Sequence, residues 1–492
     1  MNPPVLVGMA LVGKHTDLDA AAAHVVVPVH TDDTLEGIIR FDRDKPIRNL
    51  RRYVHRLLTR RHVHSLPETG SRGQGFATFG IGEGPVTGLG SWRLPQDADM
   101  ALDQQTIAQL LDTLSRFVRE RLIPAEAAVD AEDRIPDDIM ADMKDLGLFG
   151  LTIPEQYAGM GLTTVEEVEV AWTITHAAPA FRSVFGTNVT IGSQGIVMGG
   201  TEQQKMSWLP RMARGEVIAS FALTEPEAGS DAASLRTRAE RHGNGYLLNG
   251  VKRFITNAPV ADVFTVMART DPQKTGADGI SAFIVDAASD GIRLGLPYDK
   301  IGQKGARVCD VIFEDCHVPA EALIGGVEGK GFRIAMQVLD RGRLHLAATC
   351  CGLADRIIDE ALDHALDRRQ FGRPIGDFQL VQAMLADSRT EHDSAWAFVR
   401  DVARRATAGE SITRLASQAK YLASEMVGRV ADRAVQIHGG AGYINETAVA
   451  RLYRDVRLYR LYEGTSEIQK LLIARHMIRE RRELGPSQGA GR

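Results

Sequence analysis

The spacing of apolar residues changes twice along this chain, and these two changes constrain its fold more than any other feature. From Leu102 to about Ala213, apolar residues recur at the three- and four-residue steps of one face of an α-helix. Between Ser220 and about Pro319 the period falls to two, which is typical of β-strands, and past Gly331 the helical spacing returns. The order helices, strands, helices predicts an α+β multidomain protein.

The domain boundaries follow from these changes of period. We expect an N-terminal helical domain over residues 100–219, a middle β-domain over 220–330, a C-terminal bundle of long helices over 331–484, with four helices, and a flexible tail over 485–492. A length of 492 residues agrees with about three domains of roughly 150 residues each.

Local signals predict individual elements within these domains. A helix from Leu102 to Leu122 should end at Pro124, and a second from Pro136 to Leu146 should be capped by Gly147 in the left-handed conformation. Asn249-Gly250 between apolar runs predicts a hairpin turn. Further strands are expected at 263–268, 282–285 and 310–313, and long helices at 331–369, 377–406, 412–437 and 465–482.

Residues 1–99 do not share these patterns. They are rich in histidine, in arginine between Arg40 and Arg61 and in glycine between Gly70 and Gly90, with little apolar periodicity. Such a segment buries too little surface to offset its ordering entropy, so we predict an atypical extension that is disordered or loosely docked. Its arginines are either solvated surface or a tail that binds nucleic acid or a partner.

The bulk composition excludes several classes of protein. Apolar residues make up 44% and charged residues 25% of the chain, as in ordinary globular proteins, and a net charge of -5 gives no general attraction to nucleic acid or anionic membranes. Four cysteines without metal-binding spacing indicate a reducing compartment, and we expect a cytoplasmic protein with no metal site. The apolar start from Pro3 to Gly13 lacks the basic region of a secretory signal, and no apolar run is long enough to span a membrane.

Two stretches carry the most specific information about function. The segment from Phe221 to Asp231, FALTEPEAGSD, is a loop of small and hydroxyl-bearing residues, whose backbone N–H groups a ring or phosphate can approach closely. The second stretch runs from QIHGGAGY at 436–443 to YEGTSEIQ at 462–469. Together they resemble the signatures of the acyl-CoA dehydrogenase family, and the resemblance covers about residues 102–482.

The resemblance implies an FAD-dependent enzyme and a set of binding residues. Phe254-Ile255-Thr256 is similar to the family's aromatic-Ile-Thr element beside the flavin, with phenylalanine in place of the tryptophan common in relatives. The stretch around Arg368, RRQFG, is similar to an element that holds the cofactor's pyrophosphate from a neighbouring subunit, and arginine suits phosphate oxygens. The implied cofactor-binding residues are Phe221, Leu223, Thr224, Ser230, Phe254, Thr256, Arg368, Gln370, Phe371, Gln379, Gln436, Gly439, Gly440, Thr465 and Glu467; the implied substrate-binding residues are Ser230, Asp340, Arg343 and Gly464.

Glu463 matches the family's catalytic base, which removes the α-proton of the thioester while a hydride leaves the β-carbon for the flavin. Some members place their glutamate two residues after the position of Asp340, where this chain has Gly342. The α-proton is weakly acidic, so the base must be strengthened, and burial against an acyl chain and a flavin would raise the pKa of Glu463. We interpret His345 and His438, which lie among apolar residues, as packing residues.

The resemblance also implies partners and leaves alternatives open. It implies an acyl-CoA substrate, fatty acid β-oxidation, an electron-transferring flavoprotein as acceptor and a homotetramer, or at least a dimer. An acyl-CoA oxidase on the same scaffold is an alternative, and a desulfinase is disfavoured because such members lack the base. A relative that binds nucleic acid through the basic N-terminal segment is the third hypothesis. The length and branching of the acyl chain stay open.

Overall fold

A computed structural model describes residues 28–31, 34–38 and 101–484. The chain divides into two compact units, residues 1–91 and 92–492. In the first unit the described residues form an antiparallel pair, β1 (Pro28–Thr31) and β2 (Thr34–Ile38). Apart from this pair, the predicted 1–99 extension and the 485–492 tail lie outside the described residues.

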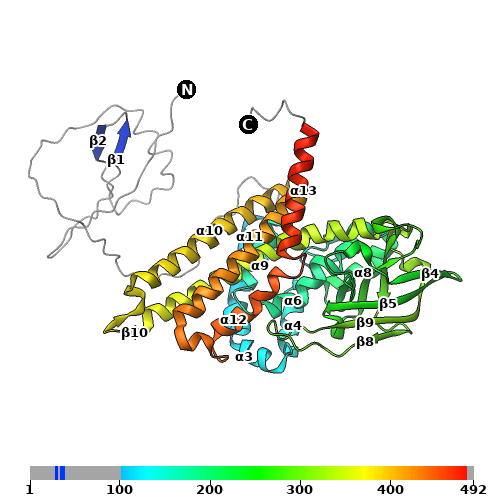
Figure 1. The fold of residues 1–492 in the computed structure, drawn as a ribbon, viewed down its shortest axis with the longest axis horizontal. Helices are drawn as coiled ribbons and strands as arrows, with labels where there is room; N and C mark the ends of the chain where they lie inside the picture. The colour runs from blue at the N-terminus through cyan, green and yellow to red at the C-terminus, as the bar shows by residue number, and fades with distance from the viewer. Residues whose placement is uncertain (1–27, 32–33, 39–100, 485–492) are drawn as a thin grey trace, which may run out of the picture. The chain divides into compact units, whose positions relative to one another are not determined.

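The second unit begins with helices (Figure 1), and those up to residue 187 pack around a shared apolar core. Asp103 caps the first of them with its side chain, and Thr163 and Thr201 each form a capping box with the residue three positions on. The predicted helix at 136–146 is confirmed, and Gly147 follows it at φ 71°. The helices are α2 (Gln104–Phe117), α3 (Ile123–Glu132), α4 (Asp137–Asp145), α5 (Thr164–Ile174), α6 (Pro179–Thr187), α7 (Gln194–Gly199) and α8 (Glu202–Ala213).

The prediction that Pro124 ends the first helix is wrong. A π-helical turn, Val118–Leu122, links α2 to α3, and Pro124 lies in the first turn of α3. Proline is tolerated there because the first N–H groups of a helix have no intrahelical acceptor. The wider π turn changes the hydrogen-bond register just before the ring, so the chain stays helical.

The middle of the chain forms a seven-stranded sheet, drawn in green in Figure 1. Its hydrogen-bonded order is β3-β6-β4-β5-β9-β8, with β7 paired to β6, and β3 runs parallel to β6. Separate apolar clusters cover its two faces, one of them with residues of α8 and α9. The strands are β3 (Ala219–Ala222), β4 (Arg238–His242), β5 (Gly245–Thr256), β6 (Val263–Arg269), β7 (Ile280–Asp286), β8 (Ile292–Leu294) and β9 (Val308–Pro319).

The hairpin predicted at Asn249-Gly250 is wrong. Both residues lie inside β5, where the register against β9 shifts between Leu248 and Gly250. Glycine is required there for a different reason, because a Cβ on Gly250 would come within 2.5 Å of the Thr237 hydroxyl. The hairpin turn lies earlier in the chain, between His242 at the end of β4 and Gly245 at the start of β5.

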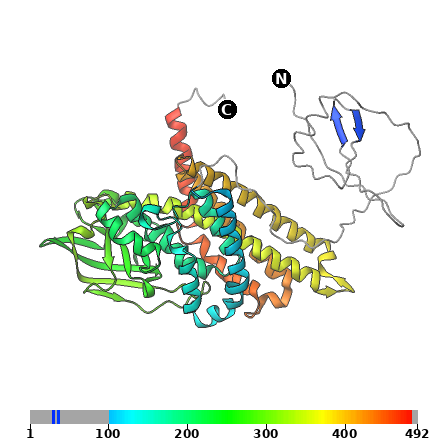
Figure 2. The same ribbon diagram turned by 180° about the vertical axis from the view of Figure 1, so that it is seen from behind.

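Long helices complete this unit (Figures 1 and 2), and those before residue 457 share one apolar core with α5. The predicted long helices are confirmed to within a few residues, and the short α12 was not predicted. These elements are α9 (Gly331–Asp367), the two-residue strands β10 (Arg369–Gln370) and β11 (Arg373–Pro374), α10 (Gln379–Thr407), α11 (Thr413–His438), α12 (Ala448–Val456) and α13 (Ser466–Leu484). The predicted α+β architecture is therefore confirmed. In the described part of the chain, no helix has the length and apolar character to cross a membrane.

Candidate active site

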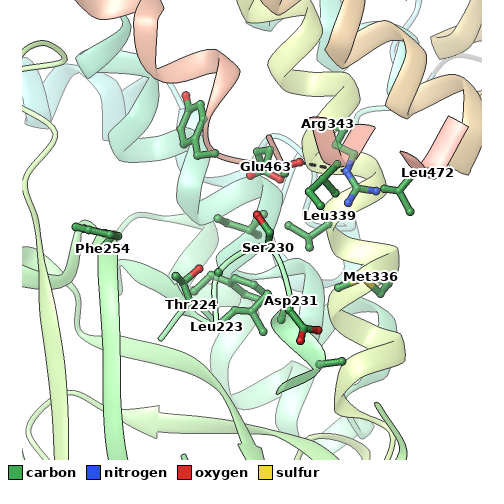
Figure 3. A pocket seen from close by; sticks show the side chains of 18 of the residues that line it. Leu223, Thr224, Ser230, Asp231, Phe254, Met336, Leu339, Arg343, Glu463 and Leu472 are labelled. Atoms are coloured by element: carbon green, nitrogen blue, oxygen red, sulfur yellow. Dashed lines mark hydrogen bonds between the residues drawn. The ribbon is translucent and has the colours of Figure 1, made fainter. Parts of the chain in front are cut away.

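A cavity of about 660 Å³ lies where the β-domain meets α9 and the start of α13 (Figure 3). The loop after β3, with Thr224, Ser230 and Asp231, forms one wall. Met336, Leu339 and Arg343 of α9 form the facing wall, and Leu471, Leu472 and Arg475 of α13 contribute its far side. Asp231 and these apolar residues were not predicted as site residues, because a helical repeat does not mark which side chains face a cavity and a loop carboxylate has no pattern of its own.

Glu463 lines this cavity from the short segment that precedes α13. Its backbone has φ +56°, a left-handed conformation that costs a non-glycine residue about 1–2 kcal/mol. The carboxylate oxygen Oε2 is buried and has no hydrogen-bond partner among the described residues. Burial raises the pKa of Glu463, and the nearby charges of Arg343, Arg182 and Lys420 oppose part of that rise. A carboxylate placed in this way is suited to accept a proton.

Gly342 lies directly beneath this carboxylate. A Cβ at that position would come within 2.9 Å of Glu463 Oε2, closer than real Cβ atoms approach. The residue two positions after Asp340 and the glutamate at 463 therefore compete for one space. With glycine at position 342, the Glu463 carboxylate lies there without having to shift.

The loop from Leu223 to Ser230 is held by a buried ion pair. Lys252 Nζ of β5 donates to Leu223 O at 3.1 Å and pairs with Glu225 Oε1 at 2.8 Å. Glu225 also accepts hydrogen bonds from the N–H groups of Arg236 and Thr237. Sequence analysis missed this pair, although a lysine at a buried position of a strand is a usable signal.

Phe254 stands beside this loop at the end of β5, and 59% of its surface is exposed. Its φ of +58° coincides with a register shift between Lys252 and Ile255, which turns the ring out of the sheet toward the cavity. The ring packs against Tyr298, with the ring centroids 5.2 Å apart, and most of its surface stays exposed on the side of the cavity. Thr256 also lines the cavity, and Phe221 and Leu223 line it as buried side chains.

The remaining predicted substrate residues lie on one side of Glu463. Arg343 Nη1 pairs with Asp340 Oδ1 at 2.7 Å, and its Nε donates to Glu463 O at 3.3 Å, the dashed contact in Figure 3. Asp340 is not in the cavity lining but fixes Arg343, and it accepts a hydrogen bond from Thr413. Gly464 lines the cavity, whereas Thr465 and Glu467 follow it at the start of α13 without reaching the lining.

The other predicted cofactor residues do not reach this cavity. Arg368, Gln370 and Phe371 lie at the β10–β11 hairpin and Gln379 at the start of α10, all exposed. Gln436, Gly439 and Gly440 lie exposed at the end of α11. Within one chain, the predicted site is therefore divided into two groups that are not brought together.

His345 is buried in a network that joins three helices. Its Nδ1 lies 2.9 Å from Glu167 of α5, and its Nε2 accepts a hydrogen bond from Arg182 of α6 at 2.9 Å. Arg341 of α9 pairs with the same glutamate at 2.7 Å. Burial, with Arg182, lowers the pKa of His345 to about 4, so the ring is neutral and structural. His438 bonds to a carbonyl of its own helix and stacks on His364.

Comparison with known proteins identifies the family. Residues 104–216, 220–316 and 329–478 match the profiles described as the N-terminal, middle and C-terminal domains of acyl-CoA dehydrogenase. The acyl-CoA dehydrogenase of Bacillus subtilis (strain 168) is 39% identical over 362 residues, which cover 74% of this chain and 95% of that protein. The 3-(aryl)acrylate reductase of Clostridium sporogenes (strain ATCC 15579) is 38% identical over 372 residues, which cover 75% and 98%.

Solved structures agree with these matches. Butyryl-CoA dehydrogenase from Megasphaera elsdenii superimposes with a TM-score of 0.73 at 33% identity, over 76% of this chain and 98% of that one. All three domains thus match in sequence and in order. The chain belongs to the acyl-CoA dehydrogenase family of oxidoreductases.

Proposed function

We propose that this chain is an FAD-dependent acyl-CoA dehydrogenase that converts an acyl-CoA to the trans-2-enoyl-CoA, with Glu463 as the base. The observation that carries the proposal is the buried Oε2 of Glu463, which has no protein partner among the described residues and borders a ligand-sized cavity. Membership of the family supports the reaction class.

The chemistry asks for a base of this kind. The α-proton of a thioester is a weak acid, so proton removal is fastest when the base has a raised pKa and direct access to the substrate. Burial supplies the raised pKa of Glu463, and its place in the cavity lining supplies the access. In this proposal Glu463 takes the α-proton onto its carboxylate.

The size and lining of the cavity support the proposal that it holds a flavin ring and the acyl end of a thioester. Its volume of about 660 Å³ is within the range of ligand sites, about 300–1,000 Å³. The hydroxyls of Thr224 and Ser230 and the exposed ring of Phe254 suit hydrogen bonding to, and stacking on, a planar heterocycle. Bound FAD would supply the acceptor for the β-hydride. Arg343, held by Asp340, would contact the CoA moiety.

The exposed second group of residues supports a role for a neighbouring subunit. Arg368, Gln370, Phe371, Gln379, Gln436, Gly439 and Gly440 do not line the cavity of their own chain. In the proposal they hold the cofactor of a second copy, with Arg368 on the pyrophosphate. The enzyme is then a homotetramer, or at least a dimer.

The acceptor and the direction of the reaction define the alternatives. We propose an electron-transferring flavoprotein as acceptor and a role in fatty acid β-oxidation. Peroxide formation without an added acceptor would instead indicate an oxidase. Two relatives are named reductases, one of an aryl acrylate and one of acryloyl-CoA, so net reduction of an enoyl thioester in the presence of a reductant is the second candidate. The cytoplasmic location stays a prediction.

Substrate bleaching of the flavin tests the function. A panel of acyl-CoA thioesters of different length, mixed anaerobically with the yellow protein, should include one that bleaches it rapidly. Glu463→Gln should retain FAD and lose bleaching by about 10²–10⁴-fold, the usual worth of a general base. Glu410→Gln, at an exposed position outside the cavity lining, is the control. Full bleaching by Glu463→Gln would refute the assignment.

A further inference from the structure

The segment that carries Glu463 is a strained turn. Glu463 and Gly464 follow one another at φ +56° and φ +87°, so two successive peptide groups take a left-handed course. Their carbonyl groups therefore have no helical or strand partners before α13 begins. A strained backbone persists only where the surrounding structure over-determines it. Something must hold these two carbonyls.

Three side chains from three helices hold them. Gln469 of α13 donates from Nε2 to Glu463 O at 2.9 Å and to Gly464 O at 3.1 Å. Arg343 of α9 donates to Glu463 O. Lys420 of α11 donates from Nζ to Gly464 O at 2.7 Å, the shortest contact of the set. The fit around Gly464 is close, because a Cβ there would come within 2.5 Å of Gln469 Nε2.

Lys420 is an unusual residue for its position. It is 0% exposed and lies in the apolar stripe of α11, between Ala416 and Ala423. The carboxylate on its own helix, Glu425, is bound instead by Arg460 and Ser466. A buried ammonium group without a direct carboxylate partner is costly, so a role in packing or in helix stability does not explain it.

We propose that Lys420 is a positioning residue for the base: it fixes the Glu463–Gly464 turn through Gly464 O and places a buried positive charge near the Glu463 carboxylate. The inference rests on the proposed function, in which Glu463 accepts the α-proton. Lys420 does not line the cavity, so it acts through the turn and not on the substrate.

The charges around the two groups set the expected pH dependence. Burial raises the pKa of Glu463, and Arg343 of α9, Arg182 of α6 and Lys420 of α11 oppose that rise. Burial lowers the pKa of Lys420 to about 8, against the opposing charges of Cys350, Glu463 and Glu425, while Arg343 acts with burial. Lys420 is therefore largely charged at neutral pH. Its removal should raise the pKa of Glu463 further.

The pH profile of flavin bleaching by the best acyl-CoA of the panel tests the inference, with FAD content checked for each variant. In this profile the rate rises with pH as Glu463 ionises, along the acid limb, and then reaches a plateau. Lys420→Met loses both the hydrogen-bond donor and the charge, so the acid limb should move about one pH unit higher and the plateau rate should fall. Lys420→Gln keeps a donor and loses the charge, so its acid limb should move by the same amount while its plateau rate falls less. If Lys420→Met does not fold, Lys420→Gln still tests the inference.

Two further variants separate the geometric role from the electrostatic one. Gln469→Leu removes a neutral hydrogen-bond donor to the same turn, so it should lower the plateau rate of bleaching without moving the acid limb to another pH. Ser424→Ala, at a buried hydroxyl of α11 that bonds only within its own helix, should change neither. An acid limb at the wild-type pH in both Lys420 variants would overturn the inference. Absence of bleaching in the wild-type protein would instead contradict the proposed function.

Discussion

Glu463 combines two properties that ordinary glutamates avoid. Its backbone is left-handed and its Oε2 is buried without a partner among the described residues. The left-handed backbone and the buried oxygen each lower the stability of the fold, and features of this kind cluster at functional sites. The pKa of its carboxyl is raised mainly by burial. Activity that needs the ionised base should therefore rise as the pH rises through this elevated value.

The pH dependence of the wild-type enzyme is the first prediction at this scale. The rate of flavin bleaching by a saturating acyl-CoA should increase with pH along a limb that lies above the ordinary glutamate pKa of about 4.3. Stopped-flow absorbance over a pH series measures it. A rate that already rises at or below the ordinary glutamate pKa would mean that Glu463 is well solvated when the substrate is bound.

The second prediction concerns Gly342. Gly342→Ala places a Cβ within 2.9 Å of Glu463 Oε2, so the carboxylate must move. The shift needed is a fraction of an ångström at the end of a flexible side chain. A displacement of about 1 Å at a reacting group costs about 10²-fold, so this smaller shift should lower the bleaching rate by roughly 3- to 10-fold. The melting temperature and FAD content should change little, since alanine suits a helix. An unchanged rate would show that the carboxylate has room to adjust.

The single residues differ in how far the sequence predicts them. Glu463 and Ser230 sit in specific motifs, and the structure places both at the cavity. Lys420 and Gln469 were not predicted, because their roles depend on contacts between α11, α13 and the turn that no local pattern records. A lysine in the apolar stripe of a helix was the available signal for Lys420.

At the scale of elements, one buried network ties the N-terminal helices to α9. Glu167 of α5 accepts from His345 and Arg341 of α9, and His345 in turn accepts from Arg182 of α6. Despite complete burial, which alone would raise it, the pKa of Glu167 is lowered to about 2 by Arg341 and His345. The network therefore contains a carboxylate that the fold keeps ionised.

Glu167→Gln should destabilise the protein by about 3–5 kcal/mol, because it leaves the largely buried Arg341 guanidinium without its carboxylate and weakens the acceptor of the neutral His345 ring. The folded pKa of Glu167 lies below its unfolded value, so its contribution is fully present above about pH 4.3 and is lost as the pH falls toward about 2. Thermal melts across pH should show a gap between the two proteins that narrows on acidification. A difference in melting temperature that stays constant with pH would contradict the dependence of stability on the ionisation of Glu167.

The elements that were wrongly predicted share a cause. Pro124 and Asn249-Gly250 are strong local breakers, yet a π turn accommodates the first and a register shift in a central strand accommodates the second. In both places the backbone accommodates the local breaker without ending the element, which a sequence pattern does not predict. The long helices have many periodic residues and were predicted to within a few residues, whereas α12, Ala448–Val456, is too short for the pattern to stand out.

At the scale of the whole molecule, the second group of predicted cofactor residues lies on an exposed surface. Phe371 is 93% and Leu380 81% exposed, beside Arg368 and Gln379. Large apolar side chains gathered beside basic and polar groups are typical of an interaction surface. The proposal that a second copy covers them explains the apolar exposure and the division of the site together.

Phe371→Asp should therefore weaken both assembly and cofactor binding. Light scattering should show smaller particles than the wild-type oligomer, and the dissociated protein should lose FAD, because Arg368 no longer reaches a neighbour's cofactor. Leu296→Asp, at an equally exposed apolar residue of the β-domain, is the control. A wild-type chain that is monomeric with FAD fully bound would contradict the placement of Arg368.

Exchange of the α-hydrogen of an acyl-CoA with solvent tests the central claim most directly, since it reports proton removal at the carbon itself. The wild-type enzyme, incubated anaerobically in D₂O with an acyl-CoA that bleaches it, should introduce deuterium at the α-carbon, as followed by NMR. Glu463→Gln with FAD bound should show only the background rate. Exchange by Glu463→Gln at the wild-type rate would show that another group removes the proton.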